Sequence, residues 1–410
     1  MNSPQPRLHR PWLYGLIKVL NDTFNGGYYA DKVLERHFKE NKKMGGRDRR
    51  FFAETFYETV RWWRRLRWAA GLPEVHIQGQ VSEEEFRQVL VAWFSIHGFD
   101  LTPFHDEGWS ADAGRVIELW ETAPAGATRE SYPDWLWEKG TEELGEHWSE
   151  VAHLSNSQAP IFLRTNRLKT SPEKLKKDLQ TENISCSLVA EFPDALMLDQ
   201  RANVFVTQAF KNGWFEVQDV GSQTVAPFLQ VEPGHRVVDA CAGAGGKSLH
   251  LAALMNNKGK IMSLDIHEWK LKELRKRASR AGADTIEVKE ISSTKVIKRL
   301  QGQMDRVLLD VPCSGSGVIR RNPDTKWKLS QEECDRLLQT QKEIFSGYAK
   351  MVKSGGKLVY ATCSLFPSEN RQQVEAFLAA HSEWVLEDEE VLLPRQGLND
   401  GFYAARLKRG

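Results

Sequence analysis

The sequence predicts an α/β protein: a parallel sheet with helices on both faces, preceded by a small α+β unit and an N-terminal helical domain. From residue 214 to 410, short apolar β-branched runs alternate with amphipathic helical segments, the pattern of a parallel sheet. Residues 141–213 hold shorter strand-like runs around one helix, and apolar residues in 1–140 recur at helical spacing. A chain of 410 residues is long enough for these three domains.

Composition places the chain among globular proteins and excludes several classes. Hydrophobic residues make up 41% of it, and no uninterrupted apolar run reaches the length of a membrane span. The apolar stretch 12–16 is soon followed by Lys18 and no small-residue cleavage site comes after it, so we expect no signal peptide. The net charge of +1 means that any affinity for nucleic acid must come from local patches.

The cysteines argue against a zinc site and against a secreted disulfide scaffold. The chain has five of them, at positions 186, 241, 313, 334 and 363, and no two form a Cys-x-x-Cys pair. We therefore expect no metal, and a reduced, cytoplasmic environment. Cys186 and Cys334 lie outside any motif, and we predict that they only pack in the interior.

Two basic stretches are candidates for contact with nucleic acid. The first is 47–68, which holds seven arginines against three acidic residues. The second comprises Arg320, Arg321, Lys326 and Lys328, directly after one of the cysteine motifs described below. The alternative for such runs is a solvated helix face, and for the first stretch the two interpretations are equally favoured.

The N-terminal domain is predicted from apolar stripes at helical spacing. One stripe is Leu13, Leu16, Ile17 and Leu20, and another is Phe52, Phe56, Val60 and Trp63. Ser82 with Glu85 three residues later makes a capping box before a third helix. No catalytic pattern occurs here, so we expect a binding or bracing module whose tryptophans lie mainly in the core.

The predicted elements of the two following domains can be given as ranges. In the small unit, strands are expected near 161–163, 186–189 and 195–198, with a helix beginning at Pro172. In the α/β domain, strands are expected at 236–239, 260–265, 286–288, 306–310 and 357–361. Helices are expected at 247–255, 268–280 and 330–352, the last capped by Ser330 with Glu333 and closed before Gly355.

A glycine-rich turn after the first of these strands predicts a cofactor loop. It comprises Cys241, Ala242, Gly243, Ala244, Gly245, Gly246 and Lys247. Glycines let backbone N–H groups approach a ligand, and Asp265 at the end of the next strand can bind the hydroxyls of a ribose. Ser248 breaks the dinucleotide pattern at its last glycine, and Cys241 replaces the first glycine of a P-loop. A site for S-adenosylmethionine tolerates looser spacing of the glycines. An ATPase would leave unexplained the two cysteine motifs that are described next.

Two cysteine motifs follow the strands that end at Asp310 and Ala361. They read Asp-Val-Pro-Cys313-Ser-Gly and Ala-Thr-Cys363-Ser. A thiolate can add to C6 of a cytosine and activate C5 toward a methyl sulfonium, while Asp310 assists at N3 and a second thiol assists elimination. If the strands are neighbours, one unstacked base reaches all three groups. The alternative is that both cysteines are buried small hydrophobes at strand ends.

With these residues in view, the chain resembles the Sun/RsmB family of RNA (cytosine-5) methyltransferases. The likeness rests on DVPCSGSGVIRRNPDTKW (310–327), LVYATCSLFPSEN (358–370), FEVQDVGSQ (215–223) and DGFY (400–403), and spans about 130–410. Residues 49–61 faintly resemble the NusB-like domain of bacterial members. The resemblance implies a class I, Rossmann-like, S-adenosylmethionine-dependent methyltransferase acting on RNA, with 16S ribosomal RNA as the expected substrate. Alternatives are the same chemistry on tRNA, or a non-catalytic assembly factor that binds RNA and the cofactor.

The resemblance also implies roles for particular residues. It makes Cys363 the nucleophile and Cys313 the residue that aids product release, with Asp310 as the aspartate of the fourth strand. The resemblance also places the cofactor site at the loop 241–247, Asp265, Glu290 and Asp310. The chain departs from the pattern at Gly243-Ala244, where Ala-Pro is usual, and at Glu290, which stands near the usual adenine-side aspartate. The oligomeric state is not defined by the sequence.

Overall fold

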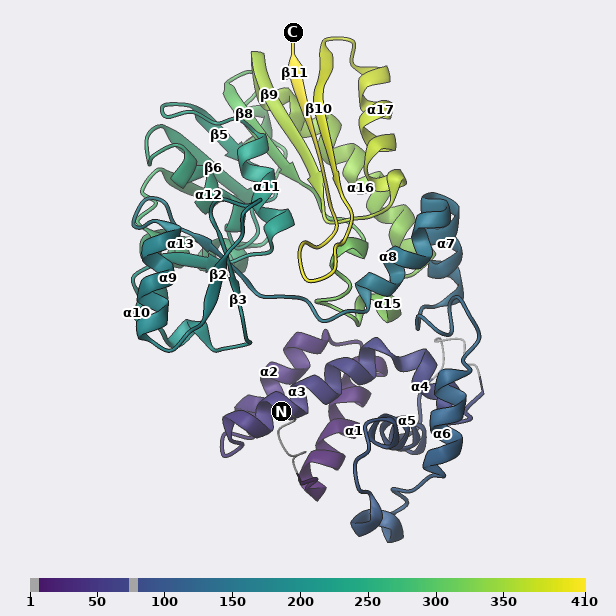
Figure 1. Ribbon diagram of the computed structural model, residues 1–410. Helices are drawn as coiled ribbons and strands as arrows, with labels where there is room; N and C mark the ends of the chain where they lie inside the picture. The colour runs from purple at the N-terminus through teal and green to yellow at the C-terminus, as the bar shows by residue number, and fades with distance from the viewer. Residues whose placement is uncertain (1–6, 74–79) are drawn as a thin grey trace. The chain divides into compact units, whose positions relative to one another are not determined.

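The computed structural model describes residues 7–73 and 80–410, which form two compact units (Figure 1). The first unit combines the N-terminal part, up to Ser157, with the segment Ile319–Gln331. The second contains Gln158–Val318 and Glu332–Gly410. In the described ranges, no helix is both long and apolar enough to cross a bilayer.

The first unit is built from helices, as the sequence predicts. They are α1 (Arg10–Phe24), α2 (Ala30–Glu40), α3 (Gly46–Arg61), α4 (Trp63–Ala69), α5 (Glu83–Ile96), α6 (Ala113–Glu121), α7 (Asp134–Leu144), α8 (Trp148–Ser155) and the short α15 (Thr325–Lys328). Both predicted apolar stripes are buried in one core. Ser82 and Glu85 form the predicted capping box at the start of α5. Six tryptophans, 12, 63, 93, 109, 148 and 327, are buried in this unit.

The second basic stretch is not a surface patch, which corrects the prediction from the sequence. Lys326 is fully buried, and its ammonium donates to the carbonyl of Arg61 at 2.7 Å and to Asn156 Oδ1 at 3.0 Å. Burial holds the pKa of Lys326 well below its usual value. Arg320 is also buried, and Trp327 Nε1 donates to the carbonyl of Val60 at 2.7 Å. The segment 319–331 is therefore part of the helical core.

Most of the first basic stretch also stabilises the helical unit. Arg49, Arg61, Arg64, Arg65 and Arg67 donate to backbone carbonyls or acidic side chains within the unit. Arg47 and Arg50 are exposed. That this stretch contacts nucleic acid stays a prediction.

The second unit begins with a small antiparallel sheet of order β2-β3-β1-β4. Its strands are β1 (Phe162–Thr165), β2 (Cys186–Leu188), β3 (Ala195–Leu198) and β4 (Phe215–Val217), with helices α9 (Pro172–Thr181) and α10 (Gln208–Lys211). The helix at Pro172 and three of the strands were expected from the sequence. The edge strand β4 lies beyond the predicted boundary at residue 213 and pairs with β1. Cys186 packs in the core of this sheet.

The larger sheet of the second unit has seven strands in the order β10-β11-β9-β8-β5-β6-β7. The strands are β5 (Arg236–Asp239), β6 (Lys260–Asp265), β7 (Ile286–Glu290), β8 (Met304–Asp310), β9 (Val352–Thr362), β10 (Trp384–Leu392) and β11 (Phe402–Arg409). Its helices are α11 (Val220–Phe228), α12 (Gly246–Leu254), α13 (Glu268–Ala281), α14 (Lys295–Lys298), α16 (Gln331–Tyr348) and α17 (Arg371–Ala380). Strands β5 to β9 are parallel to one another. Strand β11 runs antiparallel to both of its neighbours, β9 and β10.

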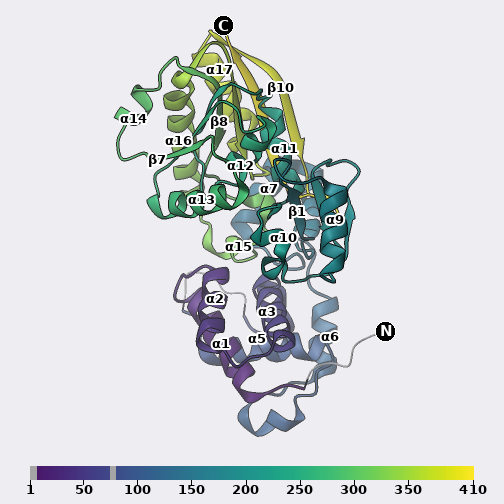
Figure 2. The ribbon, with the colours of Figure 1, turned by 90° about the vertical axis from the view of Figure 1, so that its left-hand side faces the viewer.

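Two hydrophobic layers cover the faces of this sheet, which confirms the predicted fold class. Alternate strand residues such as Val307 and Tyr360 pack against α14, α16 and α17. The residues between them, such as Leu308 and Val359, pack against α11, α12 and α13. Figures 1 and 2 show the helices on either side of the sheet.

The end of the predicted helix 330–352 was wrong. Helix α16 ends at Tyr348, a 3-10 turn follows, and β9 already begins at Val352. The pairing of β8 with β9 shifts register between Met304 and Arg306, opposite a glycine pair in which Gly355 has a φ of +73°. Glycine tolerates this left-handed conformation, so the pair forms an irregularity inside a strand instead of a helix end.

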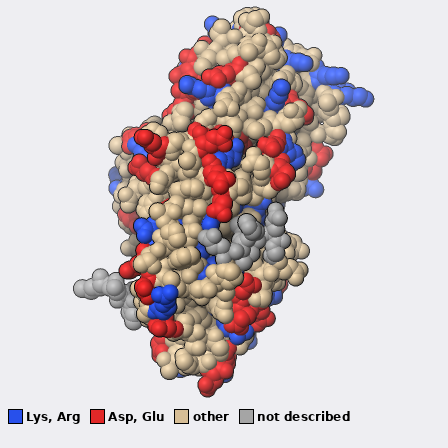
Figure 3. Space-filling model, turned by 90° about the vertical axis from the view of Figure 1, so that its right-hand side faces the viewer, with Lys and Arg blue, Asp and Glu red and all other residues tan. Residues whose placement is uncertain are grey.

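Charges are mixed on the surface of the protein. Figure 3 shows acidic and basic side chains interspersed over one face of the described residues, without a single broad basic area there. In the second unit several are paired, as in the contacts of Lys357 and Arg406 with Glu387 at 2.7 and 3.1 Å.

The buried segment 319–331 generates a test of the helical core. We expect Trp327→Ala to destabilise the first unit by about 3–5 kcal/mol, because it removes a large buried ring and its hydrogen bond to Val60. Hydrogen exchange of helices α3 and α4 in the intact chain measures this. Trp269→Ala is the matched control, since Trp269 is 66% exposed. Unchanged protection in Trp327→Ala would contradict the assignment.

Candidate active site

The predicted site residues lie at the carboxyl ends of strands of the large sheet and in the segments that directly follow them. Strand β8 pairs in parallel with β5 on one side and β9 on the other. The neighbouring arrangement expected for the strands ending at Asp239, Asp310 and Ala361 is therefore present. Asp310 is in register with Ala361, so the two cysteine loops leave the sheet side by side. Open α/β sheets bind their ligands at this carboxyl edge.

The structure brings the two cysteines of these loops together. The Sγ atoms of Cys313 and Cys363 are 3.4 Å apart, and both residues are half-buried. Both are free thiols. The hydrogen bond with Cys363, together with burial, raises the pKa of Cys313 well above its usual value. Cys313 is therefore a neutral thiol near pH 7.

Asp310 is held by the lysine of the glycine-rich loop. Lys247 Nζ lies 2.7 Å from Asp310 Oδ2 and 5.6 Å from the centre of the Phe402 ring. Burial acts to lower the pKa of Lys247, but the Asp310 carboxylate outweighs it and raises that pKa. A P-loop lysine reaches toward phosphates, whereas this one pairs with a carboxylate. The geometry therefore disfavours the ATPase alternative.

The glycine-rich loop is closely joined to Asp265. The N–H of Gly243 donates to Asp265 Oδ2 at 2.9 Å, and the N–H of His267 donates to Oδ1 at 2.8 Å. Gly243 and Gly245 have φ values of +54° and +88°, which favour glycine. A Cβ at Gly245 would lie 2.4 Å from Leu274 Cγ, so the loop packs tightly on α13. A carboxylate beside such a turn suits the ribose of an adenosine cofactor.

Two arginines that the sequence analysis did not single out fix the carbonyls of this loop. Arg164, in β1 of the small sheet, donates to the carbonyl of Gly246 at 2.5 Å. Arg277, in α13, donates to the carbonyl of Ala244 at 2.8 Å and pairs with the buried Glu216 at 2.9 Å. The small sheet thus contributes directly to the shape of the loop. Glu216 lies in the motif 215–223, and this motif was the one feature of the sequence that pointed to Glu216.

Cys241 and Glu290 of the predicted cofactor site, and Asp239 at the end of β5, which was not predicted as a site residue, have distinct surroundings. Burial raises the pKa of Asp239 to about 7, and Ser248 Oγ donates to its Oδ2 at 2.6 Å. Cys241 lies half-exposed in the loop, and desolvation raises the pKa of its thiol well above the usual value. Glu290 is exposed at the end of β7, directly opposite Asp265 in the strand pairing. Its contact with a cofactor stays a prediction.

Backbone contacts close the site on the side of β11. The N–H of Gly317 donates to the carbonyl of Cys363, and the N–H of Gly401 donates to the carbonyl of Gly317, both at 2.9 Å. The N–H of Asp400 donates to Asp219 Oδ1 at 3.2 Å. The motifs 215–223 and 400–403 therefore meet next to the second cysteine loop.

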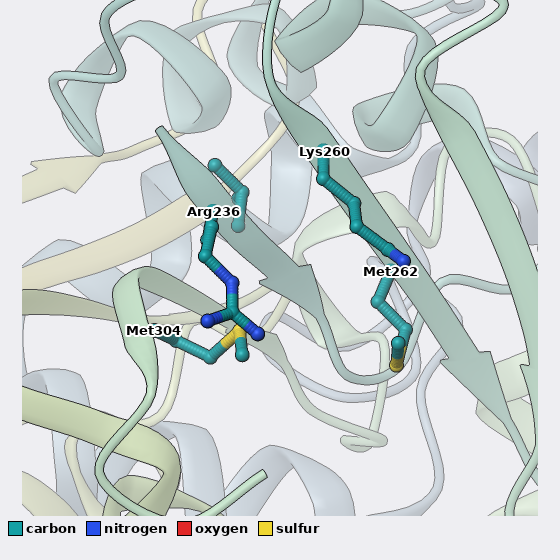
Figure 4. A pocket seen from close by; sticks show the side chains of 5 residues that line it. Arg236, Lys260, Met262 and Met304 are labelled. Carbon is teal, nitrogen blue, oxygen red and sulfur yellow. The ribbon is translucent and has the colours of Figure 1, made fainter. Parts of the chain in front are cut away.

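Other parts of the second unit do not extend this site. Figure 4 shows a shallow pocket formed by Arg236, Val237, Lys260, Met262 and Met304. Three of these residues begin strands, so the pocket lies at the amino ends of β5, β6 and β8, away from the cysteines. Among the described residues, no group of three histidines, cysteines or acids is placed to hold a metal.

The sheet order and the glycine loop with its carboxylate define a class I S-adenosylmethionine-dependent methyltransferase. The chain belongs to the family described as 16S rRNA methyltransferase RsmB/F, whose family model matches residues 226–408. A second family model, for the ferredoxin-like domain of RsmF/B-like methyltransferases, matches residues 132–205. The probable ribosomal RNA small subunit methyltransferase B of Synechocystis is 36% identical over 299 residues, covering 68% of this chain and 67% of that protein.

Solved structures share the fold. The crystal structure of PH0851 matches with a TM-score of 0.79 at 24% identity, over 98% of this chain and all of that one. The structure of NSun6 from Pyrococcus horikoshii with SFG, an analogue of S-adenosylmethionine, matches with a TM-score of 0.62 at 19% identity. That match covers 68% of this chain and 99% of the NSun6 chain.

The close backbone crossing at Gly317 generates a stability test. A Cβ at Gly317 would lie 2.3 Å from the carbonyl oxygen of Gly401 and 2.8 Å from that of Cys363. We expect Gly317→Ala to destabilise the second unit by about 1–3 kcal/mol, because the two backbone segments must separate. Denaturant unfolding measures this, with Gly347→Ala as the control, since a Cβ at Gly347 meets nothing. Equal stability of the two variants would contradict the crossing.

The contact of Arg277 with the loop generates a binding test. We expect Arg277→Gln to weaken S-adenosylmethionine binding about tenfold, equivalent to about 1.4 kcal/mol, because the carbonyl of Ala244 loses its charged donor. Titration calorimetry measures the affinity. Lys276→Gln is the control, because Lys276 is exposed on the same helix. An affinity loss shared by both variants would point to charge alone.

Proposed function

We propose that the protein is an RNA (cytosine-5) methyltransferase that forms 5-methylcytosine, with 16S ribosomal RNA as its substrate. One observation carries the proposal: two thiols lie 3.4 Å apart next to Asp310, at the sheet edge that also carries the cofactor loop. Methyl transfer to a ring nitrogen or a ribose hydroxyl needs no thiol, whereas transfer to C5 of a pyrimidine needs a nucleophile that adds at C6.

In the proposed reaction, Cys363 supplies the nucleophile and Asp310 orients the ring. The Cys363 thiolate forms a bond to C6, and the ring electrons move toward C5 as N3 gains a proton or a strong hydrogen bond. For that contact Asp310 must be protonated on the carboxyl oxygen that Lys247 does not bind, and it donates this proton to N3 and recovers it when the adduct breaks down. The bound S-adenosylmethionine supplies the methyl group that C5 then attacks.

Cys313 serves the second half of the proposed reaction. After methylation, the C5 proton must leave so that the electrons of that bond can reform the ring double bond and expel the Cys363 thiolate. Cys313 lies beside Cys363, where its thiol gives a proton to the departing Cys363 sulfur and the resulting Cys313 thiolate takes the C5 proton. The loop 241–247, Asp265 and Glu290 would hold the cofactor, while Asp310 bounds the site on the substrate side.

The choice of RNA rests on the names of the relatives. The Synechocystis protein is named a probable ribosomal RNA small subunit methyltransferase, and the family description refers to 16S rRNA. The target base must be unstacked to reach both thiols, which favours a single-stranded or loop cytosine. Action in the cytoplasm follows from such a substrate.

Replacement of each cysteine separates the two roles. With RNA that carries 5-fluorocytosine and with S-adenosylmethionine present, we expect the unaltered protein and Cys313→Ala to form a covalent adduct. Cys363→Ser should form none, because the hydroxyl adds poorly to C6. On ordinary RNA, Cys313→Ala should accumulate an adduct that the unaltered protein releases. Denaturing gel electrophoresis measures both.

The control for this experiment is Cys334→Ser, a buried cysteine of α16. Adduct formation by Cys363→Ser at the unaltered rate would overturn the assignment of the nucleophile. Cofactor binding without methyl transfer to any cellular RNA would instead favour the non-catalytic assembly factor.

A further inference from the structure

A buried carboxylate connects the two cysteine loops from behind. Glu369 lies in the 3-10 turn Pro367–Glu369 that follows β9, and it is 1% exposed. Its Oε1 accepts from the N–H of Ser314 at 2.8 Å and from Gln341 Nε2 at 2.9 Å. Its Oε2 accepts from Ser314 Oγ at 2.5 Å and from Ser364 Oγ. One side chain therefore receives four hydrogen bonds from uncharged donors.

The two serines make this contact relevant to the thiols. Ser314 directly follows Cys313, and Ser364 directly follows Cys363. The Ser316 hydroxyl links them further, at 3.2 Å from Ser314 Oγ and 3.1 Å from Ser364 Oγ. Both loops are thus tied to a single point one residue away from each sulfur atom.

Neighbouring groups fix the carboxylate and the backbone on either side of the cysteines. Tyr360 Oη donates to the backbone carbonyl of Glu369 at 2.7 Å. Gln341 also donates to the carbonyl of Pro312 at 3.0 Å, and Asn370 Nδ2 donates to the carbonyl of Ser364 at 2.9 Å. The carboxylate is therefore held on a packed strand and helix, while the loops that it binds carry no regular structure at the cysteines.

We propose that Glu369 is a positioning residue that sets the distance between the Cys313 and Cys363 sulfur atoms by binding the serine next to each. Each thiol sits on a loop that leaves its own strand, so strand pairing alone does not fix the final separation of the sulfurs. The four hydrogen bonds to one carboxylate supply that constraint. The importance of this distance for catalysis rests on the proposed function. The distance itself can be tested without that function.

The separation of the two thiols can be measured without any reaction. Dibromobimane becomes fluorescent when two thiols displace both of its bromides, so its reaction rate reports how often a pair of thiols is in reach. Peptide mapping of the product identifies Cys313 and Cys363 as the linked pair. The assay uses the full chain in the absence of RNA and cofactor.

The decisive variant is Glu369→Gln, which keeps the shape of the side chain but offers one acceptor oxygen to four donors. We expect bimane cross-linking of the pair to slow about tenfold, and kcat for RNA methylation to fall about tenfold to a hundredfold with KM nearly unchanged. Glu375→Gln is the matched control, since Glu375 is exposed on α17 and should leave both rates unchanged.

A double-variant cycle separates positioning from general bracing. If Glu369 acts through the serine hydroxyls, Glu369→Gln should have little further effect on cross-linking in a chain that already carries Ser314→Ala and Ser364→Ala. Effects that add in full would overturn the proposal, and so would an unchanged cross-linking rate in Glu369→Gln. Because Glu369→Gln keeps the shape of the side chain, it tests the positioning role even if Glu369→Ala does not fold.

The two proposals fail separately in this design. Absence of methylation by the unaltered protein on every RNA would overturn the proposed function, while slower cross-linking in Glu369→Gln would still support the positioning role. Normal methylation together with unchanged cross-linking in Glu369→Gln would overturn the positioning role and leave the function intact.

Discussion

The parallel pairing of β8 with β9 is the constraint on which the site depends. Parallel strands lie about 4.8 Å apart, so loops that leave them at the same level begin as neighbours. Asp310 and Ala361 are in register, and each is followed within three residues by a cysteine. A shift of one residue in this register would turn the side chains of one strand to the opposite face of the sheet. The two apolar layers therefore hold the register that brings the thiols together.

Sequence reasoning predicted the parts of the fold that buried β-branched runs define. The bounds of β5 and β6 agree with the structure, because each is an apolar run that ends at an aspartate. The antiparallel pair β10 and β11 was not predicted. Strand β10 carries Glu387, Asp388 and Glu389 on an edge of the sheet, so it lacks the apolar pattern that identifies a buried strand. Strand β10 is defined by its pairing with β11, which the local sequence does not reveal.

The site was predictable where chemistry follows a strand end, and not where distant segments meet. Asp265, Asp310 and the cysteine motifs stand at such ends, so topology alone brings them to one edge. Arg277 binds Ala244, and Glu369 joins the nearby Ser364 to the distant Ser314, so no spacing rule reveals either contact. Lys326 shows the opposite error: a charged residue in the sequence is expected at the surface, yet carbonyl acceptors in the helical core satisfy its ammonium.

The two thiols are in contact, and charged groups lie close to both. Glu369 places a carboxylate behind Cys313, and this charge adds to the hydrogen bond with Cys363 and to burial in keeping the pKa of Cys313 high. Lys247 pairs with Asp310 and interacts electrostatically with Cys363. Burial acts to lower its pKa, but Asp310 and Cys363 outweigh that effect, so its ammonium persists beside them. A reaction that needs one thiolate and one proton carrier at the same base requires such an inequality.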